Sequence, residues 1–476
     1  MAKESAGRDY RGAFALLTSL FFMWGFITVT NDLLVATFRG IFDLTAFESS
    51  LVQFAFFGAY FVISIIYYLI SLSAGDPINR IGYKAGMVIG LVGAGIGCAL
   101  FYPAAKQESY TFFLIALFVL ASGVTILQIA ANPYAAIMGS PESASGRLNF
   151  AQGFNSLGTT LGPLVGAILI FKVFSDGEKS PIAVSSAYLI YSGLFFLCAL
   201  MVALSSMPPF RNEEKPERGL GALKFPQVWL GVIAIFMYVG AEVSAGSFLL
   251  DFLKEPHVLN MPKEAGTRLL SFYWGGLMIG RLLGAVSLNN KLSRRTQALS
   301  MGAVSIACFF FIYFVTGINT EAGAFSYQTF PITEMGVYVA LLVVNYGGLL
   351  LGRGAPARAV GIFSVIVIAL LMIGVHTQGH LAAWSVIGVG LFNSIMWSNI
   401  FSLAIDRLGK YTSQASSLLV MAVVGGALIP PLQAYIADHH GFQVSYLVPA
   451  VCYLYLALYG WMGAGHRSSK NSNSLQ

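Results

Sequence analysis

The chain has 476 residues, of which 57% are hydrophobic and only 10% are charged, and its mean hydropathy is +0.73. A soluble globular protein carries about 25% charged residues, so this composition excludes a soluble enzyme as well as a disordered chain. The cysteines stand far apart within apolar stretches, which excludes a disulfide scaffold and a cysteine metal site; they are Cys98, Cys198, Cys308 and Cys452. The composition is that of an integral membrane protein.

Charge-free runs predict the membrane spans, because a spanning helix needs about 20 mostly apolar residues. Runs without Asp, Glu, Lys or Arg cover 12–31, 49–75, 85–105, 109–141, 148–171, 180–210, 225–241, 296–320, 335–352, 359–405, 411–437 and 439–466. The run 359–405 is long enough for two spans with a turn at 376–380, and 266–289 is a further apolar segment. The runs are continuous rather than alternating, so we expect helices, six before residue 208 and eight after residue 226.

The most polar internal stretch, 208–218, divides the chain near its middle. We therefore predict an N-terminal six-helix bundle over 1–207, a cytoplasmic linker over 208–226, a C-terminal bundle over 227–465 and a disordered tail over 466–476. With the N-terminus inside, 19 of the 27 lysines and arginines lie on the inner side, 7 on the outer side and one within a span. This bias predicts that both termini are cytoplasmic. The net charge of +6 then reflects topology and requires no nucleic-acid partner.

Three ionisable residues fall within the predicted spans, where such residues are costly and rare. They are Asp32 in the first span, Glu242 in the seventh and Arg281 in the eighth. We interpret Arg281 as reaching the inner interface with its long side chain, and the alternative for Asp32 is that it begins the outer loop. A carboxyl group in an apolar site can load and release a proton or bind sodium. Asp32 and Glu242 are therefore the predicted ion-coupling residues.

Uncharged polar residues gather on single helix faces. Gln128 and Asn132 are spaced i,i+4, which places them on one face, and Gln152 and Asn155 share another. Amides donate and accept hydrogen bonds as sugar hydroxyls do, and indole rings stack on sugar C–H faces, although bonding between helices is an equal alternative for each amide. The predicted substrate-binding residues are Gln128, Asn132, Gln152, Asn155, Asn393, Trp397, Asn399, Trp24 and Trp274.

Several stretches together resemble the fucose/glucose/galactose permease family of the major facilitator superfamily. They are Phe21–Ile27 with Asn31–Leu34, Gln128–Tyr134, Arg147–Gly158, Tyr238–Ser244, Ile400–Ile405 and Gly425–Pro431. The resemblance implies cation-coupled sugar uptake, with Asp32 at a coupling position and Asn155 at a sugar-contacting position. Gln128 replaces a glutamate of the fucose branch, and Glu242 is similar to the glucose/galactose branch. N-acetylglucosamine and fucose permeases remain alternatives within the family.

Two further features follow from the resemblance. The stretch Gly75–Lys84 resembles the superfamily's loop between spans 2 and 3, where Arg80 and Lys84 would clamp helix ends as a cytoplasmic gating loop. Simple positive-inside anchoring is an equal alternative, and Asn79 stands where an acid is more usual. The superfamily plan has twelve spans, so the count of fourteen predicts an inserted two-helix hairpin at about 296–352.

We therefore predict an all-α integral membrane protein with a major facilitator fold, a multi-pass protein of the cell inner membrane. The expected function is uptake of a hexose, glucose or galactose, by H⁺ or Na⁺ symport through alternating access. The expected partners are a small sugar and the lipid bilayer, with no nucleic acid, no cofactor, no metal and a monomeric state. The alternatives from other classes are a drug exporter, a channel and a membrane enzyme using histidines such as His376, His380, His439 and His440.

Overall fold

The N-terminal half is a helical bundle. The computed structural model describes residues 11–174, 180–208, 220–261, 263–289, 292–321, 324–327, 329–352 and 355–472. The helices of this half are α1 Arg11–Ile41, α2 Ala46–Ala74, α3 Pro77–Ile81, α4 Tyr83–Ala99, α5 Phe101–Lys106, α6 Tyr110–Ile137, α7 Ala144–Ile168 and α8 Pro181–Leu204. A 3₁₀ turn, Pro141–Ser143, precedes α7, and a π-helical turn, Leu169–Val173, continues it.

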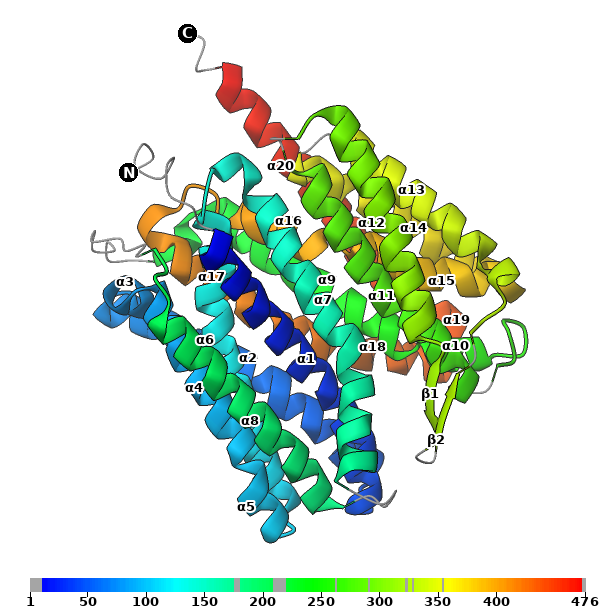
Figure 1. Ribbon diagram of the computed structural model, residues 1–476. Coiled ribbons are helices and arrows are strands. Elements are labelled where there is room, and N and C mark those ends of the chain that lie inside the picture. Colours follow the sequence, from blue (N-terminus) through cyan, green and yellow to red (C-terminus); the bar gives the residue numbers. More distant parts are fainter. Residues whose placement is uncertain are drawn as a thin grey trace.

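The C-terminal half begins after the 3₁₀ turn Gly221–Lys224. Its first elements are α9 Pro226–Ser247, α10 Leu249–Lys254, α11 Lys263–Ser287, α12 Arg294–Val315, strands β1 Ile318–Glu321 and β2 Ala324–Tyr327, the 3₁₀ turn Ile332–Met335 and α13 Gly336–Gly352. The remainder comprises α14 Pro356–His376, α15 Gly379–Asn393, α16 Met396–Ala404, α17 Thr412–Met421, α18 Gly425–His440, α19 Phe442–Ser445 and α20 Leu447–Ser472, with 3₁₀ turns at Gly409–Tyr411 and Ala422–Val424. Figure 1 shows the two halves side by side.

The predicted helical membrane architecture is confirmed. Within the described residues, 13 helical segments are long and apolar enough to cross a membrane. Helix α7 is not among them, because its 25 residues include several amides and hydroxyls. At about 1.5 Å per residue it is long enough to cross, so the count of fourteen spans stays a prediction that depends on α7. The run 359–405 divides as expected, because α14 ends at His376 and α15 begins at Gly379.

Two boundaries differ from the sequence prediction. The run 296–320 was expected to be helical throughout, but α12 ends at Val315 and an antiparallel hairpin pairs Ile318 with Tyr327. Gly317 breaks the helix, and the β-branched residue Ile318 favours extended backbone. The tail was expected to be disordered from residue 466, but α20 continues to Ser472. Extending an existing helix costs far less than starting one; residues 473–476 lie outside the described part.

The helices of the predicted inserted hairpin lie at the edge of the C-terminal half. Helix α12 packs on α11, and α13 packs on α14 and α15. Figure 1 shows both helices on the side away from α4, α5 and α8. Neither helix supplies a residue to the cavity described below, so the hairpin leaves the central arrangement of the two bundles intact.

Glycines let α1 and α7 approach until their backbones touch. A Cβ added at Gly158 would lie 2.3 Å from the Phe22 carbonyl oxygen, and one at Gly25 would lie 2.2 Å from the Asn155 carbonyl oxygen. A side chain at either position would therefore force the helices apart. The C-terminal half repeats the device, since a Cβ at Gly425 of α18 would lie 2.2 Å from the Phe236 oxygen of α9. This close packing fixes α7 against the face of α1 that carries Phe22 and Gly25.

The two bundles contact each other mainly on the side of α3. Figure 1 shows α3, α17, the start of α1 and the end of α20 toward this face, and α5, α10 and α19 toward the opposite one. The contacts join α7 to α11 and α16, and α17 to α2 and α6. Asn149 of α7 donates to Asn399 of α16 at 3.1 Å, and Ser416 of α17 donates to the Ile129 carbonyl of α6 at 3.0 Å. The space between the bundles is therefore closed toward the α3 face.

Candidate substrate cavity between the bundles

A cavity of about 380 Å³ lies between the two bundles. This volume is within the range of small-molecule sites. Its wall includes residues of α1, α2, α6 and α7 from one bundle and of α9, α11, α16 and α18 from the other. The predicted site residues on this wall are Trp24, Gln128, Gln152, Asn155, Glu242, Trp274 and Trp397.

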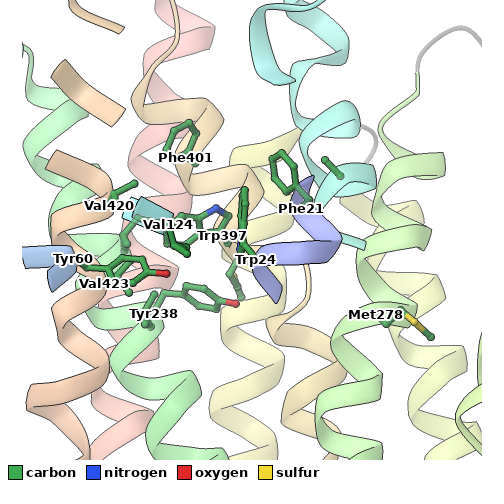
Figure 2. Packing of buried hydrophobic residues seen from close by; sticks show 14 of the residues in the cluster. Phe21, Trp24, Tyr60, Val124, Tyr238, Met278, Trp397, Phe401, Val420 and Val423 are labelled. Carbon is green, nitrogen blue, oxygen red and sulfur yellow. The ribbon is translucent and has the colours of Figure 1, made fainter. Parts of the chain in front are cut away.

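Aromatic side chains from four helices converge on the cavity. Figure 2 shows Trp24 of α1, Tyr60 of α2, Tyr238 of α9 and Trp397 of α16 gathered around one point. The Trp397 Nε1 is buried and has no hydrogen-bond partner among the described residues, whereas the buried Tyr238 hydroxyl interacts with Glu242 and Arg281. An unpaired buried donor costs about 1–3 kcal/mol. A ligand hydroxyl group that accepts from Trp397 would remove this cost.

Amides of the N-terminal bundle also line the cavity. Gln128 donates to the Tyr60 hydroxyl at 2.8 Å, which uses one of its two N–H donors. Asn155 donates to the Phe21 carbonyl at 3.1 Å, which fixes the orientation of its amide. Gln152 donates to Asn132 at 3.5 Å. The shared faces predicted from helical spacing therefore present Gln128, Gln152 and Asn155 to the cavity.

Three predicted substrate contacts do not lie on the cavity wall. Asn132 stands behind Gln152, which donates to it. Asn399 accepts from Asn149 at the contact between the bundles. Asn393 is enclosed in the C-terminal bundle, where it donates to the Tyr273 hydroxyl at 3.2 Å. Direct contact between the substrate and these three residues therefore has no support from their positions.

Glu242 is the carboxyl group of the cavity wall. It lies on α9 and faces the cavity, and it is 8% exposed. Arg281 lines the same cavity, and both its charge and the Tyr238 hydroxyl interact with the Glu242 carboxyl group. The other predicted coupling residue, Asp32, falls within the backbone of α1, but its side chain lies outside the described part. Its role stays a prediction.

The interpretation of Arg281 as an interfacial side chain is wrong. It is 7% exposed and lies between the bundles. Its Nη1 donates to the Ser156 hydroxyl at 2.6 Å and to Asn155 Oδ1 at 3.4 Å, both on α7, and its Nε donates to the Ser394 carbonyl at 3.2 Å. The helix break between α15 and α16, at residues 394–395, presents that carbonyl to the guanidinium. Sequence alone gave the signal of an arginine within a span but not its acceptors.

The loop around α3 joins helix ends on the closed face. Lys84 donates to the Ser205 carbonyl at the end of α8 at 2.7 Å, and Arg80 is exposed beside Gly75. Asn79, which replaces the more usual acid, donates to the Lys410 carbonyl of the other bundle at 3.0 Å. The gating role of Arg80 and Lys84 stays a prediction. The residue of this loop that sequence reasoning missed is Asp76, at the start of α3.

Asp76 connects the bundles through hydroxyl groups. It is 1% exposed, and it accepts from Tyr67 of α2 and from Ser413 of α17, each at 2.7 Å. We expect Ser413→Ala to raise the ratio of protein with separated α2 and α17 ends to protein with joined ends by about 10- to 100-fold, because a hydrogen bond to a carboxylate contributes about 1.5–3 kcal/mol. Spin-label distances between those helix ends measure the ratio.

Ser417→Ala is the matched control for this variant. Ser417 is also buried on α17, but it donates to Gln414 in its own helix at 2.8 Å. Its loss should leave the distance distribution unchanged. Equal distributions for the two variants would show that the Asp76–Ser413 contact does not hold the α3 face closed.

Comparisons with known proteins agree with this architecture. A family model described as Major Facilitator Superfamily matches residues 13–351. A glucose/galactose transporter of Brucella abortus is 40% identical over 468 residues, covering 97% of this chain and 96% of that protein. An L-fucose-proton symporter of Escherichia coli is 28% identical over 478 residues, covering 95% and 93%.

A solved structure is similar over nearly the whole chain. The crystal structure of the transporter FucP in an outward conformation has a TM-score of 0.73 at 26% identity, covering 96% of this chain and 99% of that one. The predicted resemblance to the fucose/glucose/galactose permeases is confirmed. The matched family model and the Brucella relative show that this chain belongs to the Major Facilitator Superfamily, and it is a transporter rather than an enzyme.

Proposed function

We propose that this chain takes up a hexose, glucose or galactose, by symport with H⁺ or Na⁺. The observation that carries the proposal is a cavity between the bundles that is lined by amides of α6 and α7 and by a buried carboxyl group on α9. The wall therefore combines groups that bind hydroxyls with one group that can exchange a cation. We further propose that the protein lies in the inner membrane with both termini in the cytoplasm, as the positive-inside bias predicts.

The chemistry of the wall favours a sugar. A hexose offers hydroxyl groups that donate and accept and C–H faces that stack on aromatic rings. Gln152 and the Tyr238 hydroxyl suit the former, and Trp24 and Trp397 suit the latter. A drug exporter would be expected to present a more apolar wall. The names of two relatives, a glucose/galactose transporter and an L-fucose-proton symporter, support the same substrate class.

The choice between hexoses rests on fewer residues. Gln128 stands where the fucose branch carries a glutamate, and here it is a neutral donor to Tyr60. This supports glucose or galactose over fucose, in keeping with the name of the relative that is 40% identical. N-acetylglucosamine is the second candidate, because an amide-lined wall also suits an acetamido group.

The closed α3 face indicates the order of steps that transport would take. In this arrangement the contacts between α2 and α17 and between α7 and α16 close the cavity on that side. Sugar and cation would enter from the opposite face, and the bundles would then rock until those contacts separate. Binding of both ligands must favour the second arrangement, since a ligand shifts an equilibrium only by its differential affinity for the two states.

Uptake by reconstituted protein tests the proposal. Proteoliposomes are given labelled glucose, galactose, N-acetylglucosamine or fucose under an imposed pH gradient, an imposed sodium gradient or neither. We expect accumulation of glucose or galactose above equilibrium with one of the two gradients. Accumulation of fucose alone would overturn the substrate assignment, and equilibration unaffected by either gradient would overturn symport.

The indole of Trp397 gives a prediction about binding. Its Nε1 has no hydrogen-bond partner within the described part of the chain, and its ring stacks on Phe401 at 6.1 Å between centroids. We expect Trp397→Phe to raise KM for the transported sugar about 3- to 10-fold, because one hydrogen bond contributes about 0.5–1.5 kcal/mol. Trp229→Phe is the control, since Trp229 is 44% exposed on the outer surface of α9; an equal KM for the two variants would contradict the role of Trp397.

A further inference from the structure

A directional chain of hydrogen bonds ends at Glu242. Tyr453 of α20 donates to Asn393 Oδ1, Asn393 Nδ2 donates to the Tyr273 hydroxyl at 3.2 Å, and Tyr273 donates to the Glu242 carbonyl oxygen at 2.8 Å. Tyr453, Asn393 and Tyr273 are each 0% exposed. These hydrogen bonds join α20, α15, α11 and α9, and they lie inside the C-terminal bundle behind the cavity wall.

The donor and acceptor groups fix the direction of each of these hydrogen bonds. The Asn393 oxygen can only accept and its nitrogen can only donate. The Tyr273 oxygen therefore accepts from Asn393, and its single proton is directed to the main chain of Glu242. Because Tyr453, Asn393 and Tyr273 are buried, loss of one hydroxyl leaves a buried group unpaired. Such a chain constrains the rotation and height of α9 at the residue whose carboxyl group faces the cavity.

The break between α15 and α16 also binds Arg281, the positively charged residue of the cavity wall. Asn393 is the last residue of α15, and the next residue, Ser394, offers its carbonyl to Arg281 at 3.2 Å. Helix α11 approaches the break closely, because a Cβ added at Gly280 would lie 2.0 Å from the Ser394 hydroxyl oxygen. Two adjacent residues of one helix break thus connect to Glu242 through Tyr273 and to Arg281 directly.

We propose that Asn393 and Tyr273 are positioning residues, which fix the Glu242 carboxyl group relative to Arg281 by bracing both on the break between α15 and α16. The inference rests on the proposed function, because it assigns the residues that hold the proposed ion-coupling group. Asn393, predicted from sequence to touch the sugar, acts instead through Tyr273 on the far side of the wall. Misplacement of Glu242 weakens binding of the cation, to which sugar binding is linked, and so raises KM modestly, whereas the rocking of folded bundles is unaffected.

Sugar exchange in proteoliposomes tests the brace. Tyr273→Phe removes the hydroxyl that contacts Glu242 and Asn393, and we expect KM for glucose or galactose to rise about fivefold with a maximal rate within about twofold of wild type, as for loss of one hydrogen bond. Tyr453→Phe removes the far end of the chain and should raise KM less. The second variant keeps the test decisive if the first folds poorly.

Tyr446→Phe is the matched control. Tyr446 is equally buried and donates to the Ala245 carbonyl of the same helix α9 at 3.0 Å, three residues beyond Glu242. This variant should keep the wild-type KM while losing the same amount of thermal stability. If KM for Tyr273→Phe and Tyr453→Phe equals that for Tyr446→Phe, the brace is overturned although transport stands. A wild-type protein that exchanges none of the four sugars overturns the proposed function itself.

Discussion

Glu242→Gln should abolish sugar accumulation while leaving exchange of sugar across the membrane intact. The amide keeps the size and hydrogen-bonding capacity of the side chain but can neither carry a proton nor hold a cation by charge. In the proposed mechanism a gradient acts only through that charge. We expect the accumulated sugar to fall to the equilibrium level, a loss of tenfold or more under a gradient of about 1.4 kcal/mol, with exchange within a few-fold of wild type.

Glu334→Gln is the control for this charge. Glu334 precedes α13 and is exposed, so its neutralisation should leave both accumulation and exchange unchanged. Retained accumulation in Glu242→Gln would transfer the coupling role to Asp32, the other residue that sequence predicts for it. Loss of exchange together with accumulation would instead show that the carboxyl group contacts the sugar.

Arg281→Gln should reduce the ratio of maximal rate to KM by about 100-fold or more. The guanidinium donates to Ser156, to Asn155 and to the Ser394 carbonyl, so its loss leaves several buried acceptors unpaired at about 1–3 kcal/mol each. Asn155 also loses the partner that orients its oxygen. Glu242 in turn loses the cation that lines its cavity. Initial rates of uptake over a range of sugar concentrations measure the effect.

Two comparison variants separate the charge of Arg281 from its geometry. Arg281→Lys keeps the charge but lacks the planar fork, so it should recover only part of the rate. Arg358→Gln, on the exposed face of α14, removes an arginine without touching the cavity and should behave as wild type. Full activity of Arg281→Lys would show that the hydrogen bonds to α7 do not matter for transport.

The spans followed from sequence because lipid imposes a simple condition. Every backbone group must be paired within the segment, and the side chains facing acyl chains must be apolar. Hydropathy alone therefore locates most of the helices, and the turn at residues 376–380 follows from its polar residues. Helix α7 shows the limit of that condition, because a helix packed between α1 and α11 can carry amides that lipid would not tolerate.

The candidate site was only partly predictable, and the helix break explains the error. Asn393 and Trp397 are spaced i,i+4, which predicts a shared face on a continuous helix. The chain breaks at residues 394–395, so Trp397 lines the cavity while Asn393 turns into the bundle. Arg281 could not be placed either, because its acceptors come from α7 and from that same break. Periodicity gives the face of a helix but not the neighbour that the face meets.

The charge moved by sugar binding is the most direct test of the account, which holds that one cavity handles the sugar and its cation together. Proteoliposomes on a solid-supported membrane, with no gradient imposed, are switched to buffer containing glucose or galactose. We expect a transient current of positive charge moving with the sugar in wild-type protein and its loss in Glu242→Gln. Sugar exchange without any current in wild-type protein, across pH and sodium concentration, would contradict the account.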